Sequence, residues 1–465
     1  MPNIDLTKAP NKFNLAYGKN IISLYDLDPS STITRFNLII KDTIGATISQ
    51  VKQIPNISGY AHFDIENILK NQVSHNPAIE TTPKLTTADY ENFSYTIDYG
   101  YDNSATYSAA TFSVLNGRKT YTEIDWDYNE YIPTVGGFTI VFGPTYVLYF
   151  DINTYCKALT DRHLEYKNYG SITDGKPNWT LQSTTKVWYI DKYVEDHYTL
   201  TWLNDFNLTT NPQYTDIHPF TTGINGFRIA IYNSSNTLLA DDEIENLTTN
   251  GGGPDTATGD FIIPSGEYNA ITLQASQLNS IIASYPTAAY FYVAPFYWYR
   301  DPDTSTSKTI VGELYRFNVV DSECDDDNHI QVSWVNSFGF RDYFTFTKKN
   351  DYRIKTKQDT YHQLDADWSG PTIEVNSYNR GERVFNKSQE VEYTATTKLL
   401  TDNEAEYLKN LYLSPDVKVR FAGDTNWTPV ILTDSEYTQR RYRYDKAFQF
   451  TINFKLANKN QIQRG

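Results

Sequence analysis

Apolar and polar residues alternate with a period of two along much of this chain. That pattern is typical of β-strands that bury one face. In RFNLIIKD, the side chains of Phe36, Leu38 and Ile40 fall on one side of such a strand. A longer alternation near the C-terminus places one apolar set on a single face: Tyr442, Tyr444, Phe448, Phe450, Ile452, Phe454 and Leu456. The sequence therefore predicts half-buried strands whose other face meets solvent or a partner.

Helical periodicity is confined to short segments. TDNEAEYLKNLYLSP carries Thr401 and, three residues later, Glu404, which is the spacing of an N-terminal capping box. Pro415 prevents this helix from continuing. The sequence predicts three helices: one after Asp64 that buries Ile65, Ile68 and Leu69, one over 273–286, and one near 402–413.

The composition agrees with a mainly β fold. The 465 residues include 38 Tyr and 24 Phe but only one Met, and aromatic residues suit a pleated sheet. We expect several β-sandwich-like modules with a few short helices. The predicted organisation is an N-terminal β module over 1–100, a middle β-rich region over 101–320 with an exposed Gly/Pro loop at 250–260, and a C-terminal β module over 321–465. Residues 77–91 are predicted to be a linker.

Charge and cysteine content limit the classes of partner. A formal net charge of −16 repels phosphate backbones and anionic membranes, which disfavours general nucleic-acid binding. Cys156 and Cys324 are far apart, so we expect two thiols in a reducing compartment. The N-terminus lacks the pattern of a signal peptide, and no apolar run approaches the length of about 20 residues that spans a bilayer. We expect no membrane association.

The chain lacks the residue spacings of the common catalytic and metal-binding motifs. The seven histidines never form H-E-x-x-H, neither cysteine belongs to C-x-x-C, and G-x-S-x-G does not occur. The acidic run 325–327 lacks the alternating spacing of a calcium loop, which favours a solvated turn. The sequence therefore predicts a protein that is not an enzyme, with no metal site and no cofactor.

A glycan site is the main alternative, because such sites combine carboxylates with aromatic rings. Asp125-Trp126-Asp127 and Asp367-Trp368 supply this combination, and Tyr290–Tyr299 could stack sugars. An inward-facing strand explains the stretch from Tyr290 better, and acidic–aromatic neighbours arise often in a chain with 56 acidic residues.

Four cations lie close together near the C-terminus, interleaved with tyrosines: Arg440, Arg441, Arg443 and Lys446. Such an arrangement could contact nucleic acid. On a chain with a net charge of −16, we instead expect a subunit interface in which these cations meet an acidic patch on a neighbour.

The two ends of the chain resemble a known group of virion proteins. NKFNLAYGKNIISLYDLD, RFNLIIKD and YAHFDIENILKNQVSHN are similar to the opening module of virion proteins of crAss-like podoviruses, which infect Bacteroides-type bacteria. VSWVNSFGFRDYFTF, EVEYTATTKLLTDNEAEYLKNLYLSPDVKV and the W-T-P-V segment at 427–430 resemble the same group.

This resemblance implies a structural subunit of the phage tail, most directly a ring protein of the tail or collar below the portal. It implies partners that are copies of the same chain in a ring, together with the portal or other tail and collar proteins. The genome would pass through the ring lumen without sequence-specific binding. The location would be the virion tail, after synthesis and assembly in the host cytoplasm. A receptor- or glycan-binding tail or baseplate protein is the alternative function.

Overall fold

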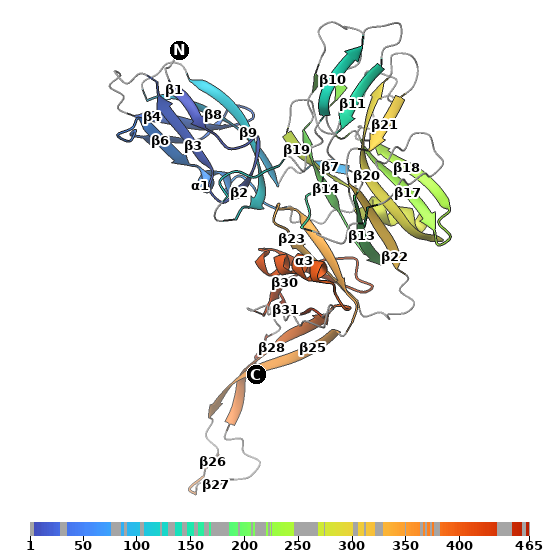
Figure 1. Cartoon of the computed structure of the whole chain (residues 1–465). Helices are drawn as coiled ribbons and strands as arrows, with labels where there is room; N and C mark the ends of the chain where they lie inside the picture. Colours follow the sequence, from blue (N-terminus) through green and yellow to red (C-terminus); the bar gives the residue numbers. More distant parts are fainter. Residues whose placement is uncertain are drawn as a thin grey trace. The chain divides into compact units, whose positions relative to one another are not determined.

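The structure is a computed structural model, and it is mainly β (Figure 1). It describes residues 4–27, 35–75, 85–87, 91–102, 107–120, 123–128, 135–141, 147–152, 157–161, 167–168, 186–193, 196–205, 208–209, 220–221, 224, 226–245, 268–273, 275–300, 306–310, 313–320, 329–348, 350–362, 366–367, 370–372, 374–375, 382–434, 449–457 and 462–464. Far more of these residues lie in strands than in helices, which confirms the predicted fold class.

The chain divides into two compact units. The first comprises residues 1–322 and 335–342, and the second comprises residues 323–334 and 343–465. The second unit begins at residue 323, and the module boundary expected at 321 stays a prediction. The boundary expected at 100 stays a prediction, because residues on both sides of it belong to the first unit.

The N-terminal part of the first unit is a β-sandwich. Side chains from its two sheets form one buried core, which includes Leu24 and Phe63 from one sheet and Leu38, Ile97 and Val114 from the other. One sheet has the strand order β2 (Phe13–Tyr17), β9 (Ser108–Arg118), β8 (Asn92–Tyr101), β4 (Phe36–Asp42), β5 (Thr47–Gln53). The other has the order β1 (Ile4–Lys8), β3 (Ile21–Asp26), β6 (Tyr60–Asp64).

Local sequence explains two features of this sandwich. Phe36, Leu38 and Ile40 are fully buried on β4, as their alternation predicts. The helix α1 (Glu66–Leu69) follows β6, and the Asp64 carboxylate accepts a hydrogen bond from the backbone nitrogen of Glu66 (3.1 Å). Ile65 and Leu69 are buried, whereas Ile68 is only partly buried, so the predicted helix is present but short.

The rest of the first unit contains a larger sheet and several smaller ones. The larger sheet has the order β12 (Lys167–Asn168), β13 (Lys186–Tyr193), β22 (Leu314–Val320), β20 (Ala288–Arg300), β17 (Gly226–Asn233), β18 (Leu238–Glu245), and β21 (Thr306–Ile310) pairs with β20. The smaller sheets are β14 (Leu200–Asp205), β19 (Tyr268–Leu273), β7 (Leu85–Thr87); β10 (Val135–Val141), β11 (Val147–Ile152); and β15 (Leu208–Thr209), β16 (Phe220–Thr221). The helix α2 (Ala275–Ser284) falls within the predicted range 273–286.

The predicted linker at 77–91 contains a strand. β7 pairs antiparallel with β19, and Thr87 lies opposite Ile271. Leu85, Thr86 and Thr87 are too few to show a period, so only the pairing partner, far away in sequence, reveals the strand. The predicted loop at 250–260 lies outside the described residues.

The second unit is built around an eight-stranded sheet. Its order is β24 (Arg341–Phe346), β23 (Ile330–Val335), β29 (Val417–Phe421), β30 (Thr428–Leu432), β31 (Thr451–Leu456), β28 (Glu382–Thr396), β25 (Asn350–His362), and β32 (Ile462–Arg464) pairs with β28. A separate pair, β26 (Ala366–Asp367) and β27 (Glu374–Val375), lies in sequence between β25 and β28.

The helix α3 (Asp402–Leu413) covers the core of this sheet. Its capping box is complete, because the Thr401 hydroxyl accepts from the backbone nitrogen of Glu404 while the Glu404 carboxylate accepts from the backbone nitrogen of Thr401 (2.8 Å). Leu408 and Leu411 are fully buried together with Ile452 and Phe454 of β31. The predicted helix and the buried face of the last long strand are therefore both confirmed within the described residues.

Candidate functional site: an exposed two-stranded arm

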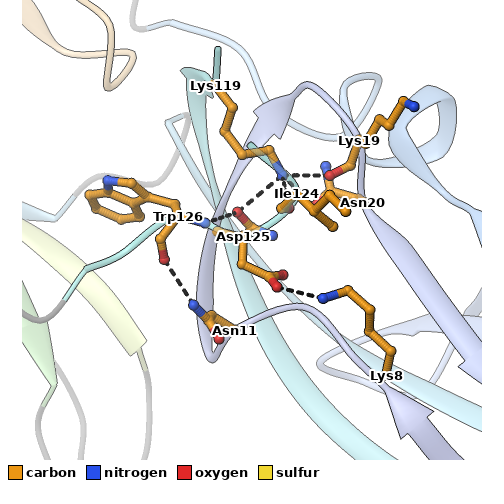
Figure 2. A network of polar contacts seen from close by, with 9 residues as sticks. Lys8, Asn11, Lys19, Asn20, Lys119, Ile124, Asp125 and Trp126 are labelled. Carbon is orange, nitrogen blue, oxygen red and sulfur yellow. Dashed lines mark hydrogen bonds and ion pairs between the residues drawn. The ribbon is translucent and has the colours of Figure 1, made fainter. Parts of the chain in front are cut away.

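The first glycan candidate, Asp125-Trp126, is part of a polar network in the first unit (Figure 2). The Asp125 carboxylate forms an ion pair with the ammonium of Lys8 (2.7 Å). The Trp126 carbonyl accepts from the Asn11 side chain (2.9 Å), and the Trp126 ring is only 8% exposed, with its centroid 5.8 Å from that of Phe338. A buried ring cannot stack on a sugar, so this candidate holds the fold together.

Lys119 is the centre of the same network (Figure 2). Its ammonium donates to the carbonyl oxygens of Lys19 (2.7 Å) and Ile124 (2.9 Å) and to the side-chain oxygens of Asn14 (3.1 Å) and Asn20 (3.4 Å). Burial lowers the pKa of Lys119 to about 8, although nearby carboxylates, Asp125 first among them, raise it in part. A lowered pKa can mark a nucleophilic amine. Here four acceptors surround the nitrogen, which indicates a structural cation that joins the segment 119–126 to the N-terminal strands.

The aromatic stretch on β20 is also buried where its side chains are described. Tyr290 and Tyr292 are 8% and 4% exposed. The guanidinium of Arg316 lies 3.7 Å from the centre of the Tyr290 ring, and the Tyr232 ring stacks on that of Tyr290. These rings therefore pack against their own sheet, as the interpretation of an inward-facing strand predicts.

Several other sequence candidates lie outside the described residues. They are the predicted interface cations Arg440, Arg441, Arg443 and Lys446, the thiols of Cys156 and Cys324, the acidic run 325–327, and Trp368. Asp367 is described as part of the short strand β26. Within the described ranges, no cluster of three or more His, Cys, Asp or Glu side chains could hold a metal ion, and no helix there has the length and apolarity needed to cross a membrane.

The most unusual feature of the second unit is a long two-stranded arm formed by β25 and β28 (Figure 1). The strands pair antiparallel from Asn350 opposite Ala395 to His362 opposite Glu382. From Asp351 to His362 every side chain of β25 is exposed, including those of Tyr352 (69%) and Ile354 (51%). β28 also pairs with β31 and β32 on its other side, whereas β25 exposes both faces. A strand that exposes both faces and large apolar side chains is typical of a surface that a partner covers.

The two faces of the arm differ in chemistry. One face carries Tyr352 and Ile354, and Val391 and Tyr393 lie opposite them on β28. Further along the arm, a bulge after Asp359 brings Phe385, which is 58% exposed, next to the ring of Tyr361.

The other face of the arm is charged. Arg353, Lys355 and Lys357 alternate along β25, while Glu390 and Glu392 lie on β28. Lys355 bridges Glu392 (2.6 Å), and Lys455 of β31 bridges Glu390 (2.7 Å). The hydrogen bond from Lys455 is the main cause that lowers the pKa of Glu390, and the hydrogen bond from Lys355 does the same for Glu392. Both carboxylates are partly buried, but the lysines that bridge them are 48% and 37% exposed, so water screens these pairs and they orient side chains more than they stabilise the fold.

No other described strand pairs with the outer edge of β25. Among the described strands, β25 is terminal in its sheet and pairs only with β28. In an antiparallel pair, alternate residues direct their N–H and C=O groups away from the neighbouring strand. An exposed edge of this kind can accept another extended strand by backbone hydrogen bonds.

The sequence of this arm has no clear signature of its exposure. In NDYRIKTKQDTYH, charged residues alternate with Tyr352, Ile354, Thr356 and Gln358, which are part apolar and part polar. No face of the strand is therefore continuously apolar. Five strand-forming residues, two Tyr, one Ile and two Thr, are spread over these 13 positions among charged and polar ones, which gives only a weak indication of a strand. A search of protein-family models found no match to the chain, and a search of curated proteins found none either.

Proposed function

We propose that the protein is a structural subunit of a tailed bacteriophage particle, most specifically a ring protein of the tail or collar below the portal. In that role it would contact copies of itself and the portal or other tail and collar proteins. It would carry out no catalysis and would need no cofactor. The resemblance of both ends of the chain to virion proteins motivates this proposal.

The observation that supports the proposal best is the β25–β28 arm. An arm with an open edge and exposed Tyr352, Ile354 and Phe385 is suited to a protein that works within an assembly. The chain as a whole is mainly β, with several sheets suited to presenting surfaces to neighbours.

The alternative, a receptor- or glycan-binding tail protein, would need an exposed aromatic and carboxylate site. Trp126 and Tyr292 are buried, and Asp125 is paired with Lys8. None of the glycan candidates that the sequence suggested is an exposed aromatic–carboxylate pair within the described residues, so we do not propose this alternative.

The test is the composition of the particle. Particles purified from cells that produce the protein should contain it in many copies, at a fixed ratio to the portal protein by quantitative mass spectrometry. Cryo-electron microscopy of the same particles should place it in a closed ring in the tail. Absence from purified particles would refute the proposal, and a few copies at the tail tip together with retention on a glycan array would favour the receptor-binding role.

A further inference from the structure

The charges along β25 follow a fixed order. Successive side chains of a strand point to opposite faces, so the odd-numbered positions of β25 share one face. Along that face the charges run negative, positive, positive, positive, negative, from Asp351 through Arg353, Lys355 and Lys357 to Asp359. A strand that pairs with this edge must therefore match both signs of charge.

The arm itself matches two of the three cations. Glu392 lies opposite Arg353 and forms an ion pair with Lys355 (2.6 Å). Glu390 lies opposite Lys355 and forms its own ion pair with Lys455 of β31 (2.7 Å). These carboxylates therefore already have cationic partners within the same chain.

The last two charges of the series lack such a match across the arm. Lys357 lies opposite Ser388, and it lowers the pKa of Glu390 less than Lys455 does. Asp359 lies opposite Asn386, whose neutral amide donates a hydrogen bond to its carboxylate (3.4 Å). Both side chains are exposed, so they are accessible to a partner.

A second copy of the same edge is the simplest partner to consider. When two identical strands pair antiparallel, a two-fold axis perpendicular to the sheet places residues at equal distances from the axis opposite each other. Such residues are an even number of positions apart, so they share a face and direct their backbone N–H and C=O groups to the same edge. Backbone hydrogen bonds are therefore compatible with an axis at any residue, and the side chains decide between these registers.

Like charges exclude most of the registers. An axis at Ile354 would place Arg353 opposite Lys355. An axis at Thr356 would place Lys355 opposite Lys357. An axis at any charged residue would place that residue opposite its own copy. Like charges directly opposite each other destabilise a sheet, so none of these registers is favoured.

An axis at Gln358 gives the opposite result. It places Lys357 of each copy opposite Asp359 of the other, so the same favourable pair occurs twice. It pairs residues 354–362 of both copies and places no like charges opposite each other. An axis at Tyr352 also avoids like charges, but it pairs a much shorter part of the described strand. Axes nearer the C-terminal end of β25 bring no opposite charges together.

The other face of the strand agrees with the same axis. It places Thr356 opposite Thr360 and Ile354 opposite His362. Opposed threonines can share a hydrogen bond across a sheet. The Thr360 hydroxyl already donates to Glu382 (2.8 Å), which leaves its oxygen to accept from Thr356 of the second copy.

We propose that two copies of the chain join through their β25 edges, antiparallel and about a two-fold axis at Gln358, so that one sheet continues across both. Backbone hydrogen bonds supply the affinity, and the paired Lys357 and Asp359 set the register. Two copies complete this isologous contact, so it differs from the heterologous contacts that close a ring. The inference goes beyond the proposed function, because it concerns two copies whether or not they belong to a ring.

Charge reversal tests the proposed contact, measured on the full chain by sedimentation velocity at low ionic strength. The wild-type chain should self-associate, and salt should weaken the association by screening the charges. Lys357→Glu and Asp359→Lys should each weaken it about tenfold or more, because each change places like charges opposite each other at two symmetric positions. The matched control is Lys387→Glu, which reverses an exposed charge on β28, one strand away from the contact. It should associate as the wild type does.

Two combinations should restore the association. An equimolar mixture of the Lys357→Glu chain and the Asp359→Lys chain should associate, because the two chains present opposite charges to each other at both positions. The double variant Lys357→Glu with Asp359→Lys should associate with itself for the same reason. No other axis places these two positions opposite each other, so both rescues report the register.

Disulfide formation tests the position of the axis independently, in a chain with Cys156→Ser and Cys324→Ser. Gln358→Cys should form a disulfide-linked dimer on mild oxidation, because residues directly opposite in an antiparallel pair have Cα atoms about 4.5–5.5 Å apart, within the range of a disulfide. Thr356→Cys is the matched control on the same face. Its two copies would lie about 14 Å apart along the strands, so it should stay reduced.

Four results would overturn the inference: a wild-type chain that stays monomeric, single charge reversals that associate normally, a mixture that does not associate, or Thr356→Cys that crosslinks as fast as Gln358→Cys. Hydrogen exchange over β25 and β28 should show that every variant is folded. The particle experiment fails or succeeds separately, because a ring subunit without this contact would still occur at a fixed ratio to the portal protein.

Discussion

Removal of the Lys119 ammonium by Lys119→Met should destabilise the N-terminal sandwich locally. The two shortest bonds of the ammonium reach the carbonyl oxygens of Lys19 (2.7 Å) and Ile124 (2.9 Å). Both oxygens are at exposed sites where water can replace the donor, so each bond should contribute about 1 kcal/mol, near the middle of the usual range. The side-chain oxygen of Asn14 also accepts from the backbone nitrogens of Leu15 and Trp126, and it stays bonded. The expected loss is about 2 kcal/mol when it is measured near pH 10, where the amine is largely neutral and the desolvation penalty on its protonated form no longer offsets these bonds.

Native-state hydrogen exchange of peptides that span 119–126 measures this loss where it occurs. A loss of about 2 kcal/mol corresponds to exchange roughly thirtyfold faster, if these amides exchange through local opening. Lys8→Met is the matched control, because it makes the same substitution in the same network but removes only one partly exposed ion pair with Asp125. It should cost less than about 1 kcal/mol. Equal exchange in wild type and Lys119→Met, or equal effects of the two substitutions, would refute the reasoning.

The same network predicts a pH dependence. Burial lowers the pKa of Lys119 to about 8 in the folded chain, against about 10.4 for an unfolded lysine. Between these values the unfolded chain binds more protons, so the contribution of Lys119 to the free energy of unfolding rises with pH across this window. Below about pH 8 the desolvation penalty on the protonated amine is fully present. NMR titration of the Lys119 side-chain carbon should show a midpoint near 8, and a midpoint above 10 would contradict this account.

Three further predictions concern stability. Gly339→Ala should lower the thermal stability more than Gly423→Ala does. Both glycines have positive φ, but of the two only Gly339 would place an added Cβ 2.5 Å from a backbone oxygen. Thermal unfolding of the two variants compares them directly. Thr401→Ala should cost about 0.5–2 kcal/mol through loss of the capping box, and unchanged exchange over α3 would contradict this. Phe454→Ala should lower the free energy of unfolding of the second unit, measured in urea, by about 3–5 kcal/mol, because Phe454 is fully buried. Ile431 lies on a neighbouring strand but is 51% exposed, so Ile431→Ala should change this free energy by less than about 0.5 kcal/mol.

Local features of the fold were predictable from the sequence. The helix α3 follows from Thr401, Glu404 and an apolar face, all within a few turns of one another. The burial of Phe36 and Leu38 follows from the period of one strand. In each case the decisive residues are neighbours in the chain, so a short window contains the whole pattern.

The candidate surfaces were not predictable in the same way. Asp125-Trp126 had the composition of a glycan site, but Trp126 is buried beside Phe338, which is far away in sequence. Composition gives the chemistry that a side chain could perform, whereas only the tertiary contacts decide whether the side chain is accessible.

The sequence by itself determined that this is a mainly β protein with acidic charge and with three short helices at the described positions. Only the tertiary structure decided that β25 ends its sheet with both faces exposed. The physical reason is that period and propensity are encoded in neighbouring residues. Strand order and exposure depend on which distant segments pair, and on whether a second layer covers them.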